Sequence, residues 1–381
     1  MFENILFQEK LVTQLSRDIA TSQLPGSLLF HGPAASGKLT TALEMARVLS
    51  CSEKGLWNCP CPHCAQHRIL AYSGLALVGE KDLGPEIDAA GAILMKQPDS
   101  PRRFLYIRTI RKLLKRFEPL LWEGEDTKVK SAGAMVEAIQ EELEALYPGS
   151  EIPLPEKLEA SVKKIRDWSE KLLGLLPAKG IPINMVRRLS YWARTASVSG
   201  GTFIIIENAD SLGEGARNSL LKILEEPPEN VRFILLTRHK GAIMPTILSR
   251  VRPYSFQNRT PAQVKDILGR LFLETSGNYP TLESFFQAYA LEGESQILTA
   301  GAEFFEGSEA GFPFSLPKLD WAQQFRPFLG ALALQNRQRL KGNPSLQEKR
   351  FRELQEALDN HENLNISPAL LLESLYYRWR P

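Results

Sequence analysis

The sequence lacks the features that mark membrane, secreted and strongly basic proteins. No stretch approaches the roughly 18 uninterrupted apolar residues of a membrane-spanning helix, and the start MFENILFQEK lacks the basic-then-apolar pattern of a signal peptide. We therefore expect a cytoplasmic protein that contacts no membrane. The net charge is only +2, so any contact with nucleic acid would have to come from a local basic surface or from assembly partners.

Cysteine is scarce, and all of it lies in one short segment. The four residues are Cys51, Cys59, Cys61 and Cys64. Such clustering in a reducing compartment favours a metal site over disulfides, and four thiolates suit tetrahedral zinc in a structural role. The spacing C-x7-C-x-C-x2-C leaves only one proline between the second and third cysteines, so His63 or His67 could replace one ligand. A loop of unliganded thiols is the alternative.

Length and composition describe a folded chain of two or three domains. At 381 residues the chain is too long for one compact core, and 43% hydrophobic with 24% charged residues is ordinary for a globular protein. The apolar pattern predicts an α/β part and then, from about residue 259, helices alone. Helices are predicted at 2–24, 39–50, 183–197 and 211–228, and strands at 27–32, within 200–210 and at 231–238. The segment between the cysteines and about residue 100 is poorly patterned.

A glycine-rich loop, HGPAASGK, follows the first predicted strand and precedes a helix, which is the context that a phosphate-binding P-loop requires. Backbone N–H groups of such a loop surround phosphate oxygens, and Gly32, Gly37 and Lys38 supply its characteristic parts. The next residue usually offers a hydroxyl to Mg²⁺, but here it is Leu39, and Thr40 is rotated about 100° further around the helix. A glycine turn with a surface lysine is the alternative.

The strand within 200–210 ends in Glu207 and Asn208, where ATPases of this type have a metal-binding carboxylate and then a glutamate that polarises water. Glu207 could still hold a metal ion, but Asn208 has no basic lone pair to accept a proton. The sequence therefore predicts a site that binds nucleotide weakly, or only keeps the fold, without efficient hydrolysis by this chain alone.

Three amphipathic helices are predicted at 103–122, 129–147 and 156–176, and the first carries a run of basic residues. These are Arg102, Arg103, Arg108, Arg111, Lys112, Lys115 and Arg116. A solvated basic face is the favoured interpretation of such a run, and a helix that contacts DNA is the alternative.

Several distinctive segments complete the sequence. They read FENILFQEKLVTQLSRDIATSQLPGSLLFHGP, ARNSLLKILEEPPENVRFILLT, TILSR at 246–250 and NISPALLLESLYYRW. Together with the cysteine cluster after the P-loop helix, they resemble the bacterial DNA polymerase III clamp-loader subunits, the delta prime and gamma/tau group of AAA+ proteins. Val251 stands where the family motif has a cysteine. The resemblance covers about residues 1–100 and 181–258, so 101–180 looks like an insertion.

The resemblance implies an α/β fold of the AAA+ type: a P-loop parallel sheet with helices and a small zinc module, followed by all-helical lid and collar domains. The implied domains are a nucleotide-binding domain in two parts, 1–180 and 181–258, with the zinc module at about 51–67, a lid at 259–300 and an oligomerising collar at 301–381.

The resemblance also implies site roles. Arg250 would act in trans as an arginine finger on a neighbouring subunit's nucleotide, the alternative being an ordinary salt bridge, and Thr237 lies near the sensor position. An intact finger beside an impaired ATP and Mg²⁺ site describes a delta prime-like subunit. Such a subunit of the DNA polymerase III holoenzyme, with gamma/tau and delta subunits, would help to load the sliding clamp onto primed DNA during replication. An active gamma/tau ATPase is the alternative, and an adaptor that binds another partner through 101–180 is a third possibility.

Overall fold

The computed structural model describes residues 1–79, 83–122, 126–177, 180–275, 279, 281–286, 295–340, 342–364 and 366–380. The chain divides into two compact units, Met1–Ser284 and Phe285–Pro381. None of the helices within the described ranges combines the length and the apolarity that a membrane crossing needs.

The first unit is built on a five-stranded sheet in the order β2-β3-β4-β1-β5, with every neighbouring pair parallel. The strands are β1 (Ser27–His31), β2 (Leu75–Val78), β3 (Thr202–Ile206), β4 (Val231–Thr237) and β5 (Arg252–Ser255). The inner strands are buried on both faces, which explains their unbroken apolar runs. The expected α/β class with a parallel sheet is confirmed.

Two strands were not expected from the sequence. β2 has only four residues and lies in the poorly patterned segment before residue 100. β5 reads RPYS and buries only Tyr254, because it is an edge strand in which Pro253 removes a backbone donor. Short or edge strands carry too little apolar periodicity to be found from sequence alone.

Helices cover both faces of the sheet. Those of the first unit are α1 (Glu9–Ala20), α2 (Lys38–Ser50), α3 (Pro62–Arg68), α4 (Gly84–Lys96), α5 (Ser100–Leu114), α6 (Pro119–Trp122), α7 (Asp126–Glu144), α8 (Pro155–Leu175), α9 (Ile183–Thr195), α10 (Glu214–Glu225), α11 (Pro245–Leu248) and α12 (Pro261–Phe272), with 3-10 turns η1 (Lys115–Phe117), η2 (Ala209–Ser211) and η3 (Lys240–Ala242).

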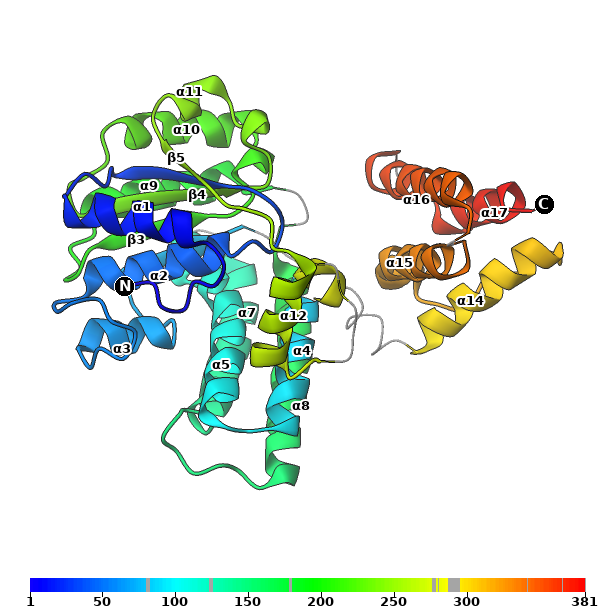
Figure 1. Ribbon diagram of the computed structural model, residues 1–381, viewed down its shortest axis with the longest axis horizontal. Helices are drawn as coiled ribbons and strands as arrows, with labels where there is room; N and C mark the ends of the chain where they lie inside the picture. The colour runs from blue at the N-terminus through cyan, green and yellow to red at the C-terminus, as the bar shows by residue number, and fades with distance from the viewer. Residues whose placement is uncertain are drawn as a thin grey trace. The chain divides into compact units, whose positions relative to one another are not determined.

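Alternate residues of the pleated strands enter two separate cores. Phe203 and Ile205 of β3 pack with α1 and α2, whereas Ile204 and Ile206 pack with α9, α10 and the helices α4 to α8. Accordingly, α2 lies on one side of the sheet, and α9 and α10 lie on the other (Figure 1).

The first helix is shorter than expected. The pattern predicted a helix from residue 2, but Phe2 and Phe7 adopt positive φ values of 66° and 61°, and α1 begins at Glu9. The side chain of buried Gln8 donates to the backbone oxygens of Ser36 and Gln257 at 3.3 and 2.9 Å. The first eight residues therefore form a strap against the glycine-rich loop rather than helix turns.

The expected solvated basic face of 103–122 is wrong. None of the seven basic side chains is exposed, and Arg103, Lys115 and Arg116 are buried. Several of them hold backbone carbonyls of the loop before β2. Arg108 donates to the oxygens of His67 and Arg68 at 3.0 and 2.8 Å, Arg111 to Ile69 at 2.9 Å, and Lys115 to Tyr72 at 2.9 Å. Helix α5 and the turn η1 thus brace this region, because their cations satisfy backbone carbonyls at the end of α3 and in the loop after it.

The second unit contains α14 (Ser295–Ala310), α15 (Trp321–Arg339), α16 (Pro344–Leu364) and α17 (Pro368–Arg378). These helices enclose an aromatic core in which Phe304 makes edge contacts with Phe328, Tyr376 and Trp379 at ring separations of 5.7, 5.0 and 6.1 Å. Within the described residues of this unit, the regular secondary structure is helical, and 311–320 form an irregular connection between α14 and α15.

Candidate functional site

The sheet brings most of the predicted nucleotide-site residues to one edge. The glycine-rich loop follows β1, Glu207 follows β3 and Thr237 ends β4, and the carboxyl ends of parallel strands meet at the same edge. His31 pairs with Thr237 in the register of β1 and β4, and Gly32 donates its N–H to the oxygen of Thr237 at 3.3 Å.

Two glycines are required by the backbone of the loop. Gly32 has a φ of 143°, and a Cβ there would lie 2.6 Å from the oxygen of Phe256. Gly37 has a φ of 97° and caps the start of α2. Residues other than glycine rarely adopt these backbone conformations, so the two predicted glycines determine the shape of the loop.

The lysine of the loop is turned onto the loop itself. Lys38 Nζ donates to the oxygen of Gly32 at 2.7 Å, to that of Pro33, and to Ser36 Oγ at 3.4 Å. Next to it, Leu39 packs against the core beneath α1 and α2, whereas Thr40 is exposed. The loop therefore has the backbone form of a phosphate cradle, with its ammonium group held by loop carbonyls.

Sequence reasoning missed Arg259, which also reaches the loop. Its guanidinium donates to the oxygen of Ala35 and, at 3.4 Å, to that of Leu6. Burial lowers the pKa of Arg259 from its ordinary value. No motif marks this residue, because it comes from the segment after β5 and meets the loop only through the fold.

At the end of β3, Glu207 forms an ion pair with Arg116, whose side chain is only 2% exposed. Asn208 follows in the left-handed conformation with a φ of 47°. Thr237 donates its hydroxyl to Asp210 Oδ1 at 2.5 Å and accepts the N–H of His239 at 3.0 Å. The hydroxyl at the predicted sensor position is therefore engaged within the chain.

Arg250 lies apart from this edge, just after α11. Its Nε and Nη2 donate to Glu225 Oε2 at 3.1 and 3.0 Å, and its Nη1 donates to the oxygen of Thr246 at 2.8 Å. Glu225 is the last residue of α10, in the segment LLKILEEPPE. Two of the distinctive segments of the sequence are thus joined by this ion pair.

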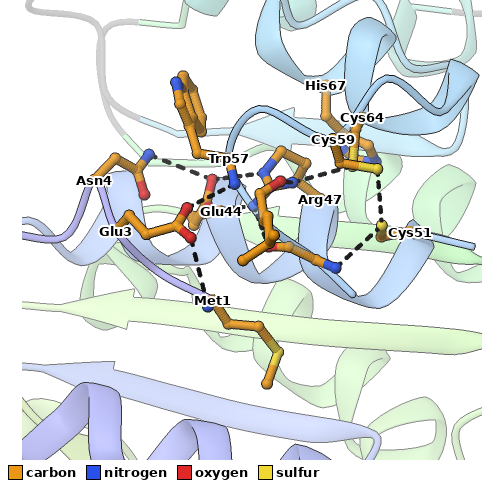
Figure 2. Close-up of polar contacts among 12 residues, drawn as sticks. Met1, Glu3, Asn4, Glu44, Arg47, Cys51, Trp57, Cys59, Cys64 and His67 are labelled. Atoms are coloured by element: carbon orange, nitrogen blue, oxygen red, sulfur yellow. Dashed lines mark hydrogen bonds and ion pairs between the residues drawn. The ribbon is translucent and has the colours of Figure 1, made fainter. Parts of the chain in front are cut away.

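The four cysteines gather into one cluster from the end of α2 to the first turn of α3, with their Sγ atoms within 4.8 Å of one another. Figure 2 labels three of them, Cys51, Cys59 and Cys64. Cys51 Sγ lies 3.6 Å from Cys59 Sγ and 3.9 Å from Cys61 Sγ. Tetrahedral zinc with bonds of about 2.3 Å to sulfur would separate its ligands by about 3.8 Å. Within the described residues, the cluster could therefore hold a metal ion, and it needs neither histidine as a ligand.

Local structure favours the thiolate form of Cys61, whereas burial raises the pKa of the Cys64 thiol to about 12. Cys61 caps the start of α3, and the N–H of Cys64 points to its sulfur at 3.4 Å. Burial by itself raises the pKa of the Cys61 thiol, but hydrogen bonds from the backbone of Cys64 and Ser52 outweigh it, and the pKa falls to about 6. Thiolates are the form that binds metal ions.

A buried arginine joins the cluster to the helix of the P-loop. Arg47 of α2 donates to Cys64 Sγ at 3.0 Å and pairs with Glu44 at 2.6 Å, and both charged side chains are 1% exposed. Asn4 also donates to Glu44, at 3.3 Å, and Glu3 accepts the backbone N–H of Trp57 at 2.6 Å, as Figure 2 shows. The N-terminal strap, α2 and the cysteine loop therefore share one polar network.

The two histidines considered as metal ligands, His63 and His67, make other contacts. His67 Nε2 lies 3.0 Å from Ser50 Oγ, and its ring stacks on Tyr72 at 4.1 Å. Burial lowers the pKa of His67 to about 3, so this ring stays neutral. His63 makes an edge contact with Tyr72 at 5.9 Å. Both rings pack beside the cluster rather than in it.

Comparisons with known proteins place the chain among replication proteins. The family model described as DNA polymerase III, delta subunit, matches residues 7–126 and 153–260, which is more than half of the chain. Of the segment expected to be an insertion, only 127–152 lies outside this match.

Curated relatives match over shorter segments. The DNA polymerase III subunit delta' of Bacillus subtilis is 30% identical over 28% of this chain and 33% of its own length. The gamma/tau subunit of Mycobacterium tuberculosis is 37% identical over 18% of this chain and 12% of its own length. Replication factor C small subunit 1 of Pyrobaculum arsenaticum is 35% identical over 23% of this chain. The chain spans about a third or less of the length of these relatives. By the family match, the chain belongs to the DNA polymerase III delta-subunit family, in the clamp-loader group of AAA+ proteins.

Proposed function

We propose that this chain is a delta prime-like subunit of the DNA polymerase III clamp loader, which assists ATP hydrolysis by a neighbour more than it hydrolyses ATP itself. The observation that carries the proposal is the contrast between two sites. Glu207 is engaged by Arg116 and is followed by Asn208, whereas Arg250 stands at the surface after α11 in an ion pair that can open. Water activation is impaired at the first site, and a guanidinium is available at the second.

The proposed partners follow from the family. Gamma/tau and delta subunits would complete the loader, and the complex would place the sliding clamp on primed DNA. Arg250 would approach the γ-phosphate of a neighbour's ATP, where the planar, permanently charged guanidinium stabilises transferred charge. Zinc held by Cys51, Cys59, Cys61 and Cys64 would be structural, because four protein ligands leave no open coordination position.

The finger is tested by replacing Arg250 with alanine in the assembled loader. ATP hydrolysis by the complex should fall by about 10³-fold or more, the scale of arginine-finger losses. Arg166→Ala is a matched control, because Arg166 is also a surface arginine in an ion pair, with Asp88 at 2.7 Å. An Arg250→Ala complex that assembles and keeps the control's rate would exclude the finger.

The same assay separates this proposal from an active gamma/tau ATPase. Lys38→Ala removes the ammonium group of the P-loop without touching Arg250. We expect the rate of the assembled complex to stay unchanged, because the neighbour supplies the hydrolytic site. A collapsed rate would instead support hydrolysis at this chain's own loop.

A further inference from the structure

The carboxylate of Glu207, which follows β3, is neutralised by an arginine of the same chain. Glu207 is largely buried, and Arg116 Nη2 donates to its Oε2. The guanidinium is also buried, and a buried arginine stays protonated at every pH at which proteins are folded. A permanent positive charge therefore lies on the acidic group that P-loop ATPases use to position their metal ion.

The place of this guanidinium is fixed by its backbone. Arg116 belongs to the turn η1, which packs against β2, and Trp122 Nε1 donates to the oxygen of Arg116 at 2.7 Å. The ring of Trp122 also stacks on Phe117 at 5.6 Å, with 3° between the planes. On the other side of Arg116, Lys115 donates to the oxygen of Tyr72 at 2.9 Å. Contacts before and after Arg116 fix the turn. The guanidinium of Arg116 therefore stays next to Glu207.

The strand end is anchored in the same way. Glu207 donates its N–H to the oxygen of Val78 at 2.9 Å, and Gly79 lies so close that a Cβ there would come within 2.4 Å of Glu207 Cβ. The backbone on both sides of the ion pair is therefore held in place by neighbouring elements. The pair is therefore a feature of the folded edge of the sheet.

The surrounding groups do not fit Mg²⁺. This ion takes six oxygen ligands in near-octahedral geometry and repels a neighbouring guanidinium. The hydroxyl that usually completes its site is replaced by Leu39, which packs in the core. Displacing Arg116 would leave a buried positive charge without its carboxylate, which is costly.

We propose that Arg116 is a built-in cation that takes the place of magnesium on Glu207, so that any nucleotide bound by this chain's P-loop binds without help from the metal ion. This inference rests on the proposed function and adds a cause for the impaired nucleotide site of this chain. The site lacks a metal ligand at Leu39, and in addition the guanidinium of Arg116 occupies the position of the metal ion. The P-loop would bind phosphate through backbone N–H groups and Lys38 alone.

The test compares thermal unfolding of the full-length, zinc-loaded chain with ATP, in the presence and absence of Mg²⁺. Magnesium is omitted rather than chelated, because a chelator would also remove zinc. A ligand that binds only the folded state raises the melting temperature by mass action. We expect Mg²⁺ to add no ATP-dependent rise in the wild type or in Arg116→Lys, which keeps the cation, and to add a rise in Arg116→Ala. The rise should vanish in Arg116→Ala/Glu207→Gln.

Two outcomes would overturn the inference. One is a magnesium-dependent rise in the wild type that Glu207→Gln abolishes, and the other is a folded Arg116→Ala variant as insensitive to Mg²⁺ as the wild type. If Arg116→Ala does not fold, the comparison of wild type with Glu207→Gln decides: equal insensitivity supports the built-in cation. The Arg250→Ala assay concerns the neighbour's nucleotide, so the proposed function and this inference can fail separately.

Discussion

At the residue scale, the ion pair between Arg250 and Glu225 bears directly on the proposed finger. The two side chains are 28% and 58% exposed. Exposed pairs contribute only about 0–1 kcal/mol to stability, so Arg250 can exchange Glu225 for a neighbour's phosphate at little cost.

Glu225→Gln should therefore have a mild effect. We expect the melting temperature of the chain to stay unchanged, and ATP hydrolysis by the assembled loader to remain within about 5-fold of wild type, because 1 kcal/mol changes an equilibrium by about that factor. Glu226→Gln, at the next exposed glutamate, is the matched control. A loss as deep as that of Arg250→Ala would show that Glu225 itself is essential to the trans site.

A functional residue can be recognised in the sequence when its neighbours in the chain mark it, and it cannot when its partner lies far away in the sequence. Gly32 and Gly37 were identified because they belong to a local P-loop pattern, and both adopt the positive φ that favours glycine. The cysteines were identified because their clustering is itself a signal. By contrast, the partner of Glu207 lies 91 positions away, and nothing in the sequence selects Arg116 from its basic neighbours. The fold makes that choice, because η1 turns this arginine toward the sheet edge.

At the element scale, the basic helix α5 shows why charge patterns mislead. A run of basic residues usually marks a solvated surface, and a water-facing helix was the natural expectation. The end of α3 and the loop before β2 instead present backbone carbonyls toward α5 and η1, and placing cations against these carbonyls satisfies both groups. The density of basic residues could be read from the sequence, but the direction they face could not, since it depends on an adjacent loop with little pattern of its own.

If the cysteine cluster holds zinc, the structure of the cysteine loop should depend on that metal ion. Helix α3 has only seven residues, too few to be stable in isolation, and the cysteine cluster, Arg47 and the contact of His67 with Ser50 tie it to α2. If zinc is bound there, chelation should increase hydrogen exchange in the segment 51–68, while β1, β3 and β4 remain protected by the two sheet cores. Hydrogen exchange with mass spectrometry measures both regions in one experiment.

The control for this prediction is Cys64→Ser, which removes the most buried thiol of the cluster and Arg47's sulfur partner. It should reproduce the exchange pattern of the chelated wild type without chelator, and metal analysis should find less than one zinc per chain. Normal protection of 51–68 in a metal-free chain would contradict a structural metal and favour a loop held by packing and by Arg47.

At the scale of the whole molecule, the two compact units have cores with no residue in common. The cores of the first unit lie on the two faces of its sheet, and that of the second lies among α14 to α17. The helical character of the tail was predictable, since its apolar spacing is that of helices throughout. The position at which the second unit begins, Phe285, was not, because a change of core leaves no mark in a uniformly helical pattern.

Because the two units have separate cores, a substitution in the core of one unit should destabilise that unit and leave the other unchanged. Phe328 is fully buried and contacts the rings of Phe304 and Trp321 at 5.7 and 5.3 Å. Phe328→Ala should lower the stability of the second unit by about 3–5 kcal/mol, the usual cost of an aromatic-sized cavity, whereas Phe328→Leu should cost less than about 1.5 kcal/mol. Hydrogen exchange should rise across α15 to α17 in the alanine variant and remain at its wild-type level in β3 and β4. Equal loss of protection in the sheet would show instead that the two units unfold as one cooperative body, and a collar that only assembles subunits would then be the wrong description of the tail.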